Sequence, residues 1–207
     1  MFGIINYGGF ILSAVLLNLT PGSDTIYVLT RSVAGGRKTG VISALGISGG
    51  ILTHTILAAL GLSVILQQSP IAFDIVKYAG AAYLVFLGIK TVFSKKALLS
   101  TYDDSIDTSS AAVFGQGMLT NLLNPKLALF FLALLPQFVA PRNTYGALPF
   151  LLLGLTFFTT STIWSVFLAF AASYASRLLE KSPKAQAAAG KISGAIYILL
   201  GLNVLRA

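Results

Sequence analysis

Three ionisable side chains, Asp24, His54 and Lys126, lie inside long apolar stretches of the sequence, where such side chains are rare. An acid at the centre of a membrane helix costs about 2.5 to 3.5 kcal/mol on insertion scales, so its default interpretation is a role in function. Asp24 is the acid placed well inside such a stretch, since Asp74 lies near an end and Glu180 is expected in a connection. Its carboxylate could hold a substrate ammonium group or carry a proton.

Each of these side chains also has a second interpretation. Lys126 could be the counterion of Asp24, could bind a substrate carboxylate, or could extend toward the membrane surface. If the first apolar stretch ends at Thr20, Asp24 is a residue of a hydrated loop. His54 is either a proton relay or a hydrogen-bonded structural histidine. The sequence leaves these alternatives open.

Prolines interrupt two apolar stretches at corresponding places, Pro21 and Pro125. Thr20 and Asn124, which precede them, are N-cap residue types, so each pair is expected to restart a helix inside the bilayer. The start of such a helix has unpaired N–H groups and a positive dipole end, which suit a carboxylate. Gly22 would let a ligand approach the backbone closely. Alternatively, Pro21 simply ends one helix and Pro125 only bends another.

Matching breaks in two halves of a membrane protein are typical of the substrate site of a transporter. The neighbouring Asn121 could line the same polar cavity or bond an adjacent helix. The predicted substrate-binding residues are Thr20, Pro21, Gly22, Asp24, Asn121, Asn124, Pro125 and Lys126. The predicted proton-coupling residues are Asp24 and His54.

The composition predicts a membrane protein. Of the 207 residues, 56% are hydrophobic and 10% are charged, whereas about 25% are charged in a typical soluble domain. Six apolar stretches approach or exceed the roughly 20 residues needed to cross a bilayer. They are Ile4–Leu29, Val41–Leu66, Ile71–Phe93, Val113–Val139, Gly146–Tyr174 and Gly190–Leu205. We therefore expect an all-α membrane protein with six transmembrane helices in a single domain, residues 1–207.

A short internal repeat divides the expected helices into two halves. Lys77–Tyr83 and Lys191–Tyr197 share Lys, Gly, Ala and Tyr at the same offsets. The halves are residues 1–93 and 113–207, joined by a polar cytoplasmic loop over 94–112. Because each half has three helices, the two would enter the membrane from opposite sides as inverted repeats, with the first and fourth helices broken. Chance similarity between helices rich in Gly and Ala is the alternative.

The basic residues predict the orientation. Ten lie in the connections after the first, third and fifth stretches, namely Arg31, Arg37, Lys38, Lys90, Lys95, Lys96, Arg177, Lys181, Lys184 and Lys191. Three lie on the other side, namely Lys77, Arg142 and Arg206. This bias places the three connections in the cytoplasm and both termini outside. The net charge of +8 is dispersed between apolar stretches, so we expect no nucleic-acid partner.

Several other classes of function fit the sequence poorly. The absence of cysteine excludes disulfides and thiolate metal sites, and one histidine with six acids gives no metal-ligand spacing, so no cofactor is expected. The N-terminus lacks the features of a signal peptide. A serine protease pairing Ser48 with His54 fails, because six helical residues place the two side chains on different faces. An aspartyl intramembrane protease would need a second interior acid.

At this point the sequence resembles a known family. The segments Thr20–Thr25, the glycine-rich stretch with His54, Lys77–Leu84, Leu119–Lys126 and Leu135–Phe138 look like the LysE/RhtB family of bacterial amino-acid exporters. The resemblance implies a small multi-pass protein of the cytoplasmic membrane that exports amino acids, driven by the proton gradient. Members often have a second proline where this chain has Ser23, and either Asn or Asp in place of Asp24.

The sequence therefore predicts efflux of neutral amino acids or derivatives, such as homoserine, threonine or leucine, by alternating access with proton coupling. One interior acid beside Lys126 fits a neutral zwitterion better than a dication. The expected partners are the amino-acid substrate, the proton or membrane potential, and the lipid bilayer; a homodimer stays open. The alternatives are a membrane scaffold, which would not explain the paired breaks, or an intramembrane enzyme.

Overall fold

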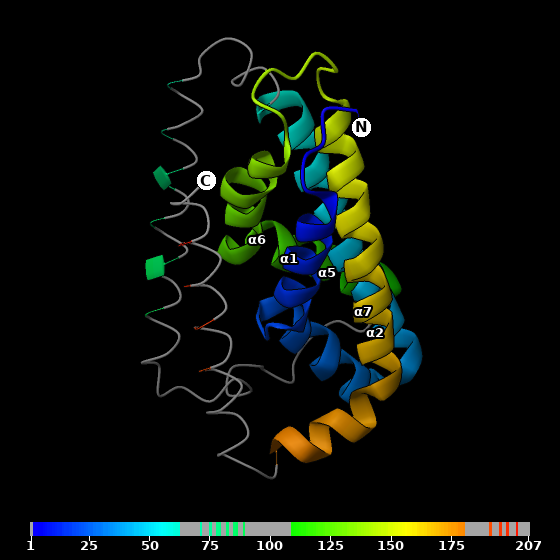
Figure 1. The fold of residues 1–207 in the computed structure, drawn as a ribbon. Helices are drawn as coiled ribbons and strands as arrows, with labels where there is room; N and C mark the ends of the chain where they lie inside the picture. The colour runs from blue at the N-terminus through cyan, green and yellow to red at the C-terminus, as the bar shows by residue number, and fades with distance from the viewer. Residues whose placement is uncertain are drawn as a thin grey trace.

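The computed structural model describes residues 2–62 and 109–180, together with single helical positions within 71–89 and 191–202. In this part of the chain the regular structure is helical, and the isolated antiparallel bridge Ile4–Val139 joins the N-terminal segment to a later one. Figure 1 shows the helices arranged side by side, with α1 beside α7 and the long α2 running behind them. The predicted all-α class is confirmed for these residues.

The first predicted helix, Ile4–Leu29, is two helices in the structure. Helix α1 spans Tyr7–Leu19, and helix α2 begins at Ser23 and continues to Leu57, followed by the π-helical turn η1, Ala58–Leu62. The expected connection before Val41 is a kink within α2 at Gly36, with φ 74° and ψ −177°. Only glycine adopts this backbone conformation readily, so Gly36 is where the chain changes direction between the two helical parts of α2.

The predicted stretch Val113–Val139 is also divided. Helix α5 spans Ser110–Leu122, and Pro125–Leu129 forms the short helix α6. The chain continues as the π-helical turn η2, Phe130–Leu134, and the 3-10 turn η3, Leu135–Phe138. The two parts meet at an angle of 50°. The predicted break at Pro125 is therefore confirmed as a sharp bend.

Helix α7 spans Leu148–Glu180 and extends beyond the predicted end at Tyr174. Arg177 and Glu180, which we expected in a connection, therefore belong to the helical backbone. The helix is predominantly apolar through Ala172 and is long enough to cross a membrane.

The described residues account for part of the predicted set of spans. Ser23–Leu62 and Leu148–Ala172 are each long and apolar enough to cross a membrane, and the bent pair Ser110–Leu122 with Pro125–Phe138 makes a third span if it is counted as one. The predicted spans Ile71–Phe93 and Gly190–Leu205, and both copies of the repeat, lie outside the continuously described residues. Six helices and an inverted repeat remain predictions.

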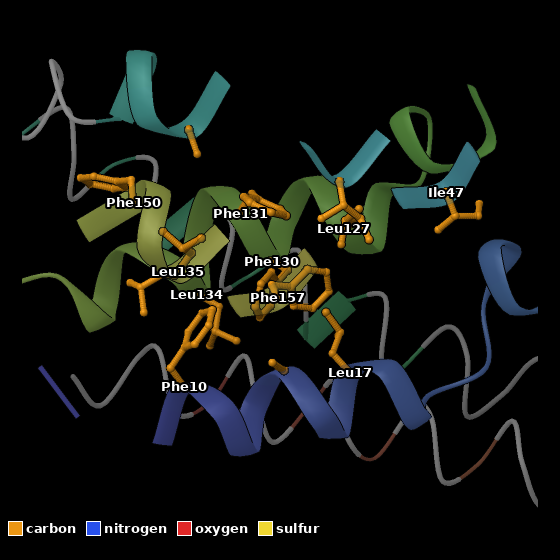
Figure 2. Close-up of a cluster of buried hydrophobic side chains, with 14 of the residues drawn as sticks. Phe10, Leu17, Ile47, Leu127, Phe130, Phe131, Leu134, Leu135, Phe150 and Phe157 are labelled. Carbon is orange, nitrogen blue, oxygen red and sulfur yellow. The ribbon is translucent and has the colours of Figure 1, made fainter. Parts of the chain in front are cut away.

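An aromatic core fixes α1 and α7 against the segment that follows the second break. Figure 2 shows Phe10 and Leu17 of α1 pointing toward this segment. The ring centroid of Phe130 lies 5.8 Å from that of Phe10 and 4.4 Å from that of Phe157 on α7. These rings are almost fully buried, and tilted aromatic pairs at such distances stabilise packing beyond their buried area. The core therefore holds the segment after the bend against α1 and α7.

Glycines let α2 and α5 approach each other closely. A Cβ atom added to Gly46 would lie 2.3 Å from the carbonyl oxygen of Phe114, and one added to Gly117 would lie 2.9 Å from that of Ser43. A Cβ on Gly50 would lie 2.5 Å from the side-chain oxygen of Asn121. The Gly46 and Gly50 face thus serves helix packing, as expected from its spacing. This close contact places the side chain of Asn121 against α2.

Candidate functional site

The first break differs in detail from the sequence prediction. Thr20 is the C-cap of α1 rather than the N-cap of the next helix, and its hydroxyl donates to the carbonyl oxygen of Leu16 at 2.7 Å. Gly22 is the N-cap of α2, in an extended conformation and without a side-chain cap. The predicted N-cap role of Thr20, with Pro21 at the first helical position, is therefore wrong. A threonine hydroxyl can satisfy a carbonyl of the preceding turn as readily as it can cap the next helix.

The second break follows the prediction. Asn124 is the N-cap of α6, Pro125 occupies the first turn, and the Asn124 side-chain oxygen accepts from the backbone N–H of Lys126 at 3.0 Å. Proline suits this position because its missing N–H would have no helical partner there and its φ already fits a helix. The start of α6 at the second break is therefore capped by a residue of the break itself.

Asp24 lies in the first turn of α2, where a carboxylate is favoured by the helix dipole. Its two oxygens accept from the side-chain amides of Asn121 at 2.8 Å and Asn124 at 2.9 Å. Ser23 donates to the same carboxylate at 3.4 Å. Asp24 is therefore a partly buried helical residue bound to the second break, so the alternative of a hydrated loop residue is excluded.

Lys126 is buried, with 7% of its surface exposed. Its ammonium nitrogen donates to the carbonyl oxygen of Thr20 at 3.1 Å and to that of Leu17 at 3.4 Å. A Cβ atom added to Gly22 would lie 3.2 Å from the same nitrogen, so the missing side chain at Gly22 leaves room for Lys126. The described contacts include no ion pair within 4.0 Å between Lys126 and Asp24. Lys126 thus binds the C-terminal carbonyls of α1 rather than pairing directly with the acid.

These contacts link the two breaks in both directions. We call Thr20, Gly22, Asp24, Asn121, Asn124 and Lys126 the junction. An acid after the first break accepts from amides at the second, and an amine after the second break donates to carbonyls at the first. Buried polar groups of this kind cost free energy when they lose their partners. The residues of the junction can therefore leave their present partners only if another charged or polar group takes the place of those partners.

His54 lies on α2 one helical turn beyond Gly50, close to the junction. Its ring stacks on Phe131 with a centroid distance of 5.5 Å, and its Nε2 atom is buried without a hydrogen-bond partner. It lines an apolar cavity of about 250 Å³ together with Leu57, Ala58, Gly61, Leu62, Ala128, Phe131 and Leu132. The side-chain oxygen of Asn121 is likewise buried without a partner. A histidine with an unpartnered nitrogen is compatible with the predicted proton relay.

Other polar residues of the apolar stretches form links between or within helices. Asn18 donates to the hydroxyl of Thr160 at 3.3 Å, and Gln137 donates to its own helical turn at Ala133. Ser48 bonds the hydroxyl of Thr162 and the carbonyl of Ala44. Its partners are thus on α7 and on its own helix, as expected if it does not pair with a histidine. Among the residues described, no three His, Cys, Asp or Glu side chains gather as metal ligands.

Arg31 is a further residue that sequence reasoning misplaced. We expected it in a cytoplasmic connection, but it lies within α2, 7% exposed, and donates to the side-chain oxygen of Gln116 on α5. The signal was present in the sequence. Asp24, Tyr27 and Arg31 follow one another at spacings of three and four, which places them on one face of a helix.

The family comparison agrees with this geometry. The sequence profile of the LysE type translocators matches residues 15–207. The chain belongs to this family. It is therefore a membrane transport protein, and the resemblance drawn from the two breaks is confirmed. Membership of a transporter family is consistent with the expectation that the chain is not an enzyme.

Three relatives match nearly the full length of this LysE family member. The uncharacterized membrane protein YrhP of Bacillus subtilis is 34% identical over 205 residues, covering 94% of this chain and 95% of its own. The homoserine/homoserine lactone efflux protein of Salmonella typhimurium is 34% identical over 194 residues, covering 93% and 92%. An uncharacterized membrane protein of Vibrio cholerae is 32% identical over 193 residues, covering 93% of each. No solved structure matches.

Proposed function

We propose that this protein exports neutral amino acids or their derivatives, such as homoserine, threonine or leucine, across the bacterial cytoplasmic membrane. The observation that carries the proposal is the junction, where the partly buried Asp24 carboxylate and the buried Lys126 ammonium group come from two helix breaks and are not paired with each other. A neutral amino acid carries the complementary pair of charges. The relative in Salmonella typhimurium, whose name is that of a homoserine and homoserine lactone efflux protein, supports the same substrate class.

The contacts of the junction suggest how a substrate would bind. Its ammonium group would replace the amides of Asn121 and Asn124 on the Asp24 carboxylate, and its carboxylate would draw the Lys126 ammonium away from the carbonyls of α1. A charged donor forms stronger hydrogen bonds to a carboxylate than a neutral amide does. The exchange would therefore favour the bound state while removing the bonds that link the two breaks.

Loss of these links gives a physical basis for alternating access. In the structure, the junction ties the end of α1 and the start of α2 to the chain around α5 and α6. With substrate bound, the two breaks contact the ligand instead of each other, so the two halves can move around it. Proton coupling would follow if Asp24 exchanges its substrate ammonium for a proton after release. His54 has a buried Nε2 atom without a hydrogen-bond partner, which is suited to relaying that proton.

We further propose that the connection around Gly36 faces the cytoplasm and that both termini lie outside. Arg37 and Lys38 are exposed beside the kink, which supports this orientation. Removing Arg31 and Arg177, which lie within α2 and α7, from the count of connection residues lowers the bias from ten to eight against three, so the prediction does not depend on them. Six helices, inverted repeats and a homodimer stay part of this proposal.

The direct test is efflux from cells that overproduce the protein, measured with a panel of labelled amino acids. We expect Asp24→Asn to abolish efflux without lowering the amount of protein in the membrane, because it removes the charge but little volume. The matched control is Asp104→Asn, in the segment that the sequence predicts to be a polar loop, and this variant should export normally. A Asp24→Asn variant that keeps its rate and its sensitivity to a protonophore would remove Asp24 from the mechanism. If no labelled amino acid is exported by the natural protein, the proposed function is wrong.

A further inference from the structure

Arg31 is a buried cation that takes no part in the contacts of the junction. It lies on α2 between the first break and the kink at Gly36, and 7% of its surface is exposed. Its Nη2 atom donates to the Gln116 side-chain oxygen, and its guanidinium carbon lies 5.6 Å from the ring centre of Tyr27. Its Nε atom is buried without a partner. The guanidinium is therefore held in place by neutral groups with a donor left over.

No acidic side chain pairs with Arg31 in the part of the chain whose side chains the structure describes. Asp24 is the carboxylate present there, and it precedes Arg31 by seven residues, or about 10 Å along a helix that rises about 1.5 Å per residue. A charge buried without an opposite charge costs several kcal/mol unless something compensates it. The position of Arg31 thus calls for an anionic partner that comes from outside the described structure.

The geometry favours a carboxylate as that partner. A guanidinium presents its N–H groups as a planar fork that matches the two oxygens of a carboxylate. Gln116 and Tyr27 fix the plane of the group, so little conformational freedom remains to be lost on binding.

We propose that Arg31 is a first binding site for the substrate carboxylate on the cytoplasmic side of the junction, a proposal that rests on the export function above. An α-amino acid carries both charges on one carbon atom, so it cannot contact Arg31 and Asp24 at the same time across two helical turns. The substrate therefore binds first at Arg31 and then moves along one face of α2. At the junction its ammonium group meets Asp24 and its carboxylate passes to Lys126.

The test is transport into inside-out vesicles, where the cytoplasmic face is exposed to a known concentration of labelled homoserine, threonine or leucine. Arg31→Gln should raise the half-saturating concentration about tenfold, roughly the value of one charge-assisted hydrogen bond, and leave the maximal rate within about twofold. Arg31→Lys should fall between, because lysine keeps the charge but lacks the fork. Arg37→Gln, an exposed arginine of the same end, is the matched control and should leave both constants unchanged.

A second variant tests the idea without removing the cation. Gln116→Glu keeps the size of the side chain and supplies Arg31 with an internal carboxylate, so it should compete with the substrate and raise the half-saturating concentration by a similar factor. A purely structural arginine would gain an ion pair and transport would not weaken. Amides of the same amino acids should compete poorly with them in the natural protein. In Arg31→Gln this difference should become smaller, although Lys126 still favours a carboxylate at the junction.

The outcomes separate this proposal from the export function. If the natural protein transports amino acids and both Arg31→Gln and Gln116→Glu keep its half-saturating concentration, Arg31 is structural and the site is wrong. If Arg31→Gln does not reach the membrane folded, Gln116→Glu decides alone. If the effect of Arg31→Gln disappears in vesicles made of zwitterionic lipid, the anion is a lipid headgroup and the substrate assignment is wrong. If no amino acid is transported at all, the export function fails and this inference with it.

Discussion

The two breaks have similar sequences, but they solve the problem of an interrupted helix differently. At the second break, the Asn124 side chain caps the restarted helix and proline fills its first turn. At the first break, Gly22 provides no side-chain cap, and Pro21 lies in the extended connection between α1 and α2. The carbonyl groups at the end of α1 accept from Lys126, which is more than a hundred residues away, whereas the start of α6 is capped locally by Asn124.

The two breaks therefore have different roles, although their sequences are similar. A helix start that caps itself is stable wherever its neighbours move, while a helix end that depends on a distant amine is stable only while that amine stays in place. The second break is therefore the rigid side of the junction. The first break, with open N–H groups and a carboxylate in the first turn, is the side that can change partners.

The largest expected effect comes from removing the amine that supports the first break. Lys126→Met keeps a long apolar side chain but leaves the carbonyls of Leu17 and Thr20 without the donor shown in the structure. We expect efflux to fall by about 100-fold, equivalent to about 2.7 kcal/mol, with the protein still present in the membrane. Lys38→Met, at an exposed lysine on α2, should export normally. Efflux by Lys126→Met near the natural rate would mean that the first break does not depend on the second.

A smaller effect is expected from filling the space beside the first break. Gly22→Leu would place a side chain where Lys126 now lies, since even a Cβ would be 3.2 Å from its ammonium nitrogen. Because a lysine side chain can shift, we expect a loss of affinity of about tenfold rather than misfolding, measured as substrate binding to purified protein with helix content checked by circular dichroism. Gly115→Leu on α5, where a Cβ meets no atom within 4 Å, is the control. Equal binding by both variants would show that close packing at Gly22 has no part in the site.

The smallest effects should differ between the two capping residues. Asn124→Ala removes a helix N-cap and one bond to Asp24, and should lower the free energy of unfolding by about 1 to 3 kcal/mol. Thr20→Val removes one hydroxyl bond to Leu16 and should cost about 1 kcal/mol or less. Thermal unfolding in detergent compares the two. A Thr20→Val variant less stable than Asn124→Ala would reverse the assignment of the rigid side.

Local signals explain which parts of the fold were predictable. The apolar stretches, the two helix breaks and the cap formed by Asn124 depend on residues that are close together in the sequence. These features could therefore be predicted from the sequence. The predicted roles of Thr20 and Arg31 failed for a shared reason. A threonine beside a proline can cap either of two helices, and an arginine after an apolar stretch can lie in a connection or extend the helix inward. The choice depends on Gln116 and Lys126, which are more than eighty residues away.

The sequence by itself determined that this is a membrane protein. It also determined at which residues the helices break and which charged side chains lie near those breaks. Hydrophobicity and backbone hydrogen bonding decide these features, and both act over short distances along the chain. The tertiary structure alone decided that Asp24 accepts from Asn121 and Asn124, and that Lys126 supports α1 instead of pairing with the acid. These partners are separated by 97 to 106 residues, and the glycine contact between α2 and α5 brings the first of them together. A buried charge takes whatever partner packing places within reach, and the order of the residues does not specify that partner.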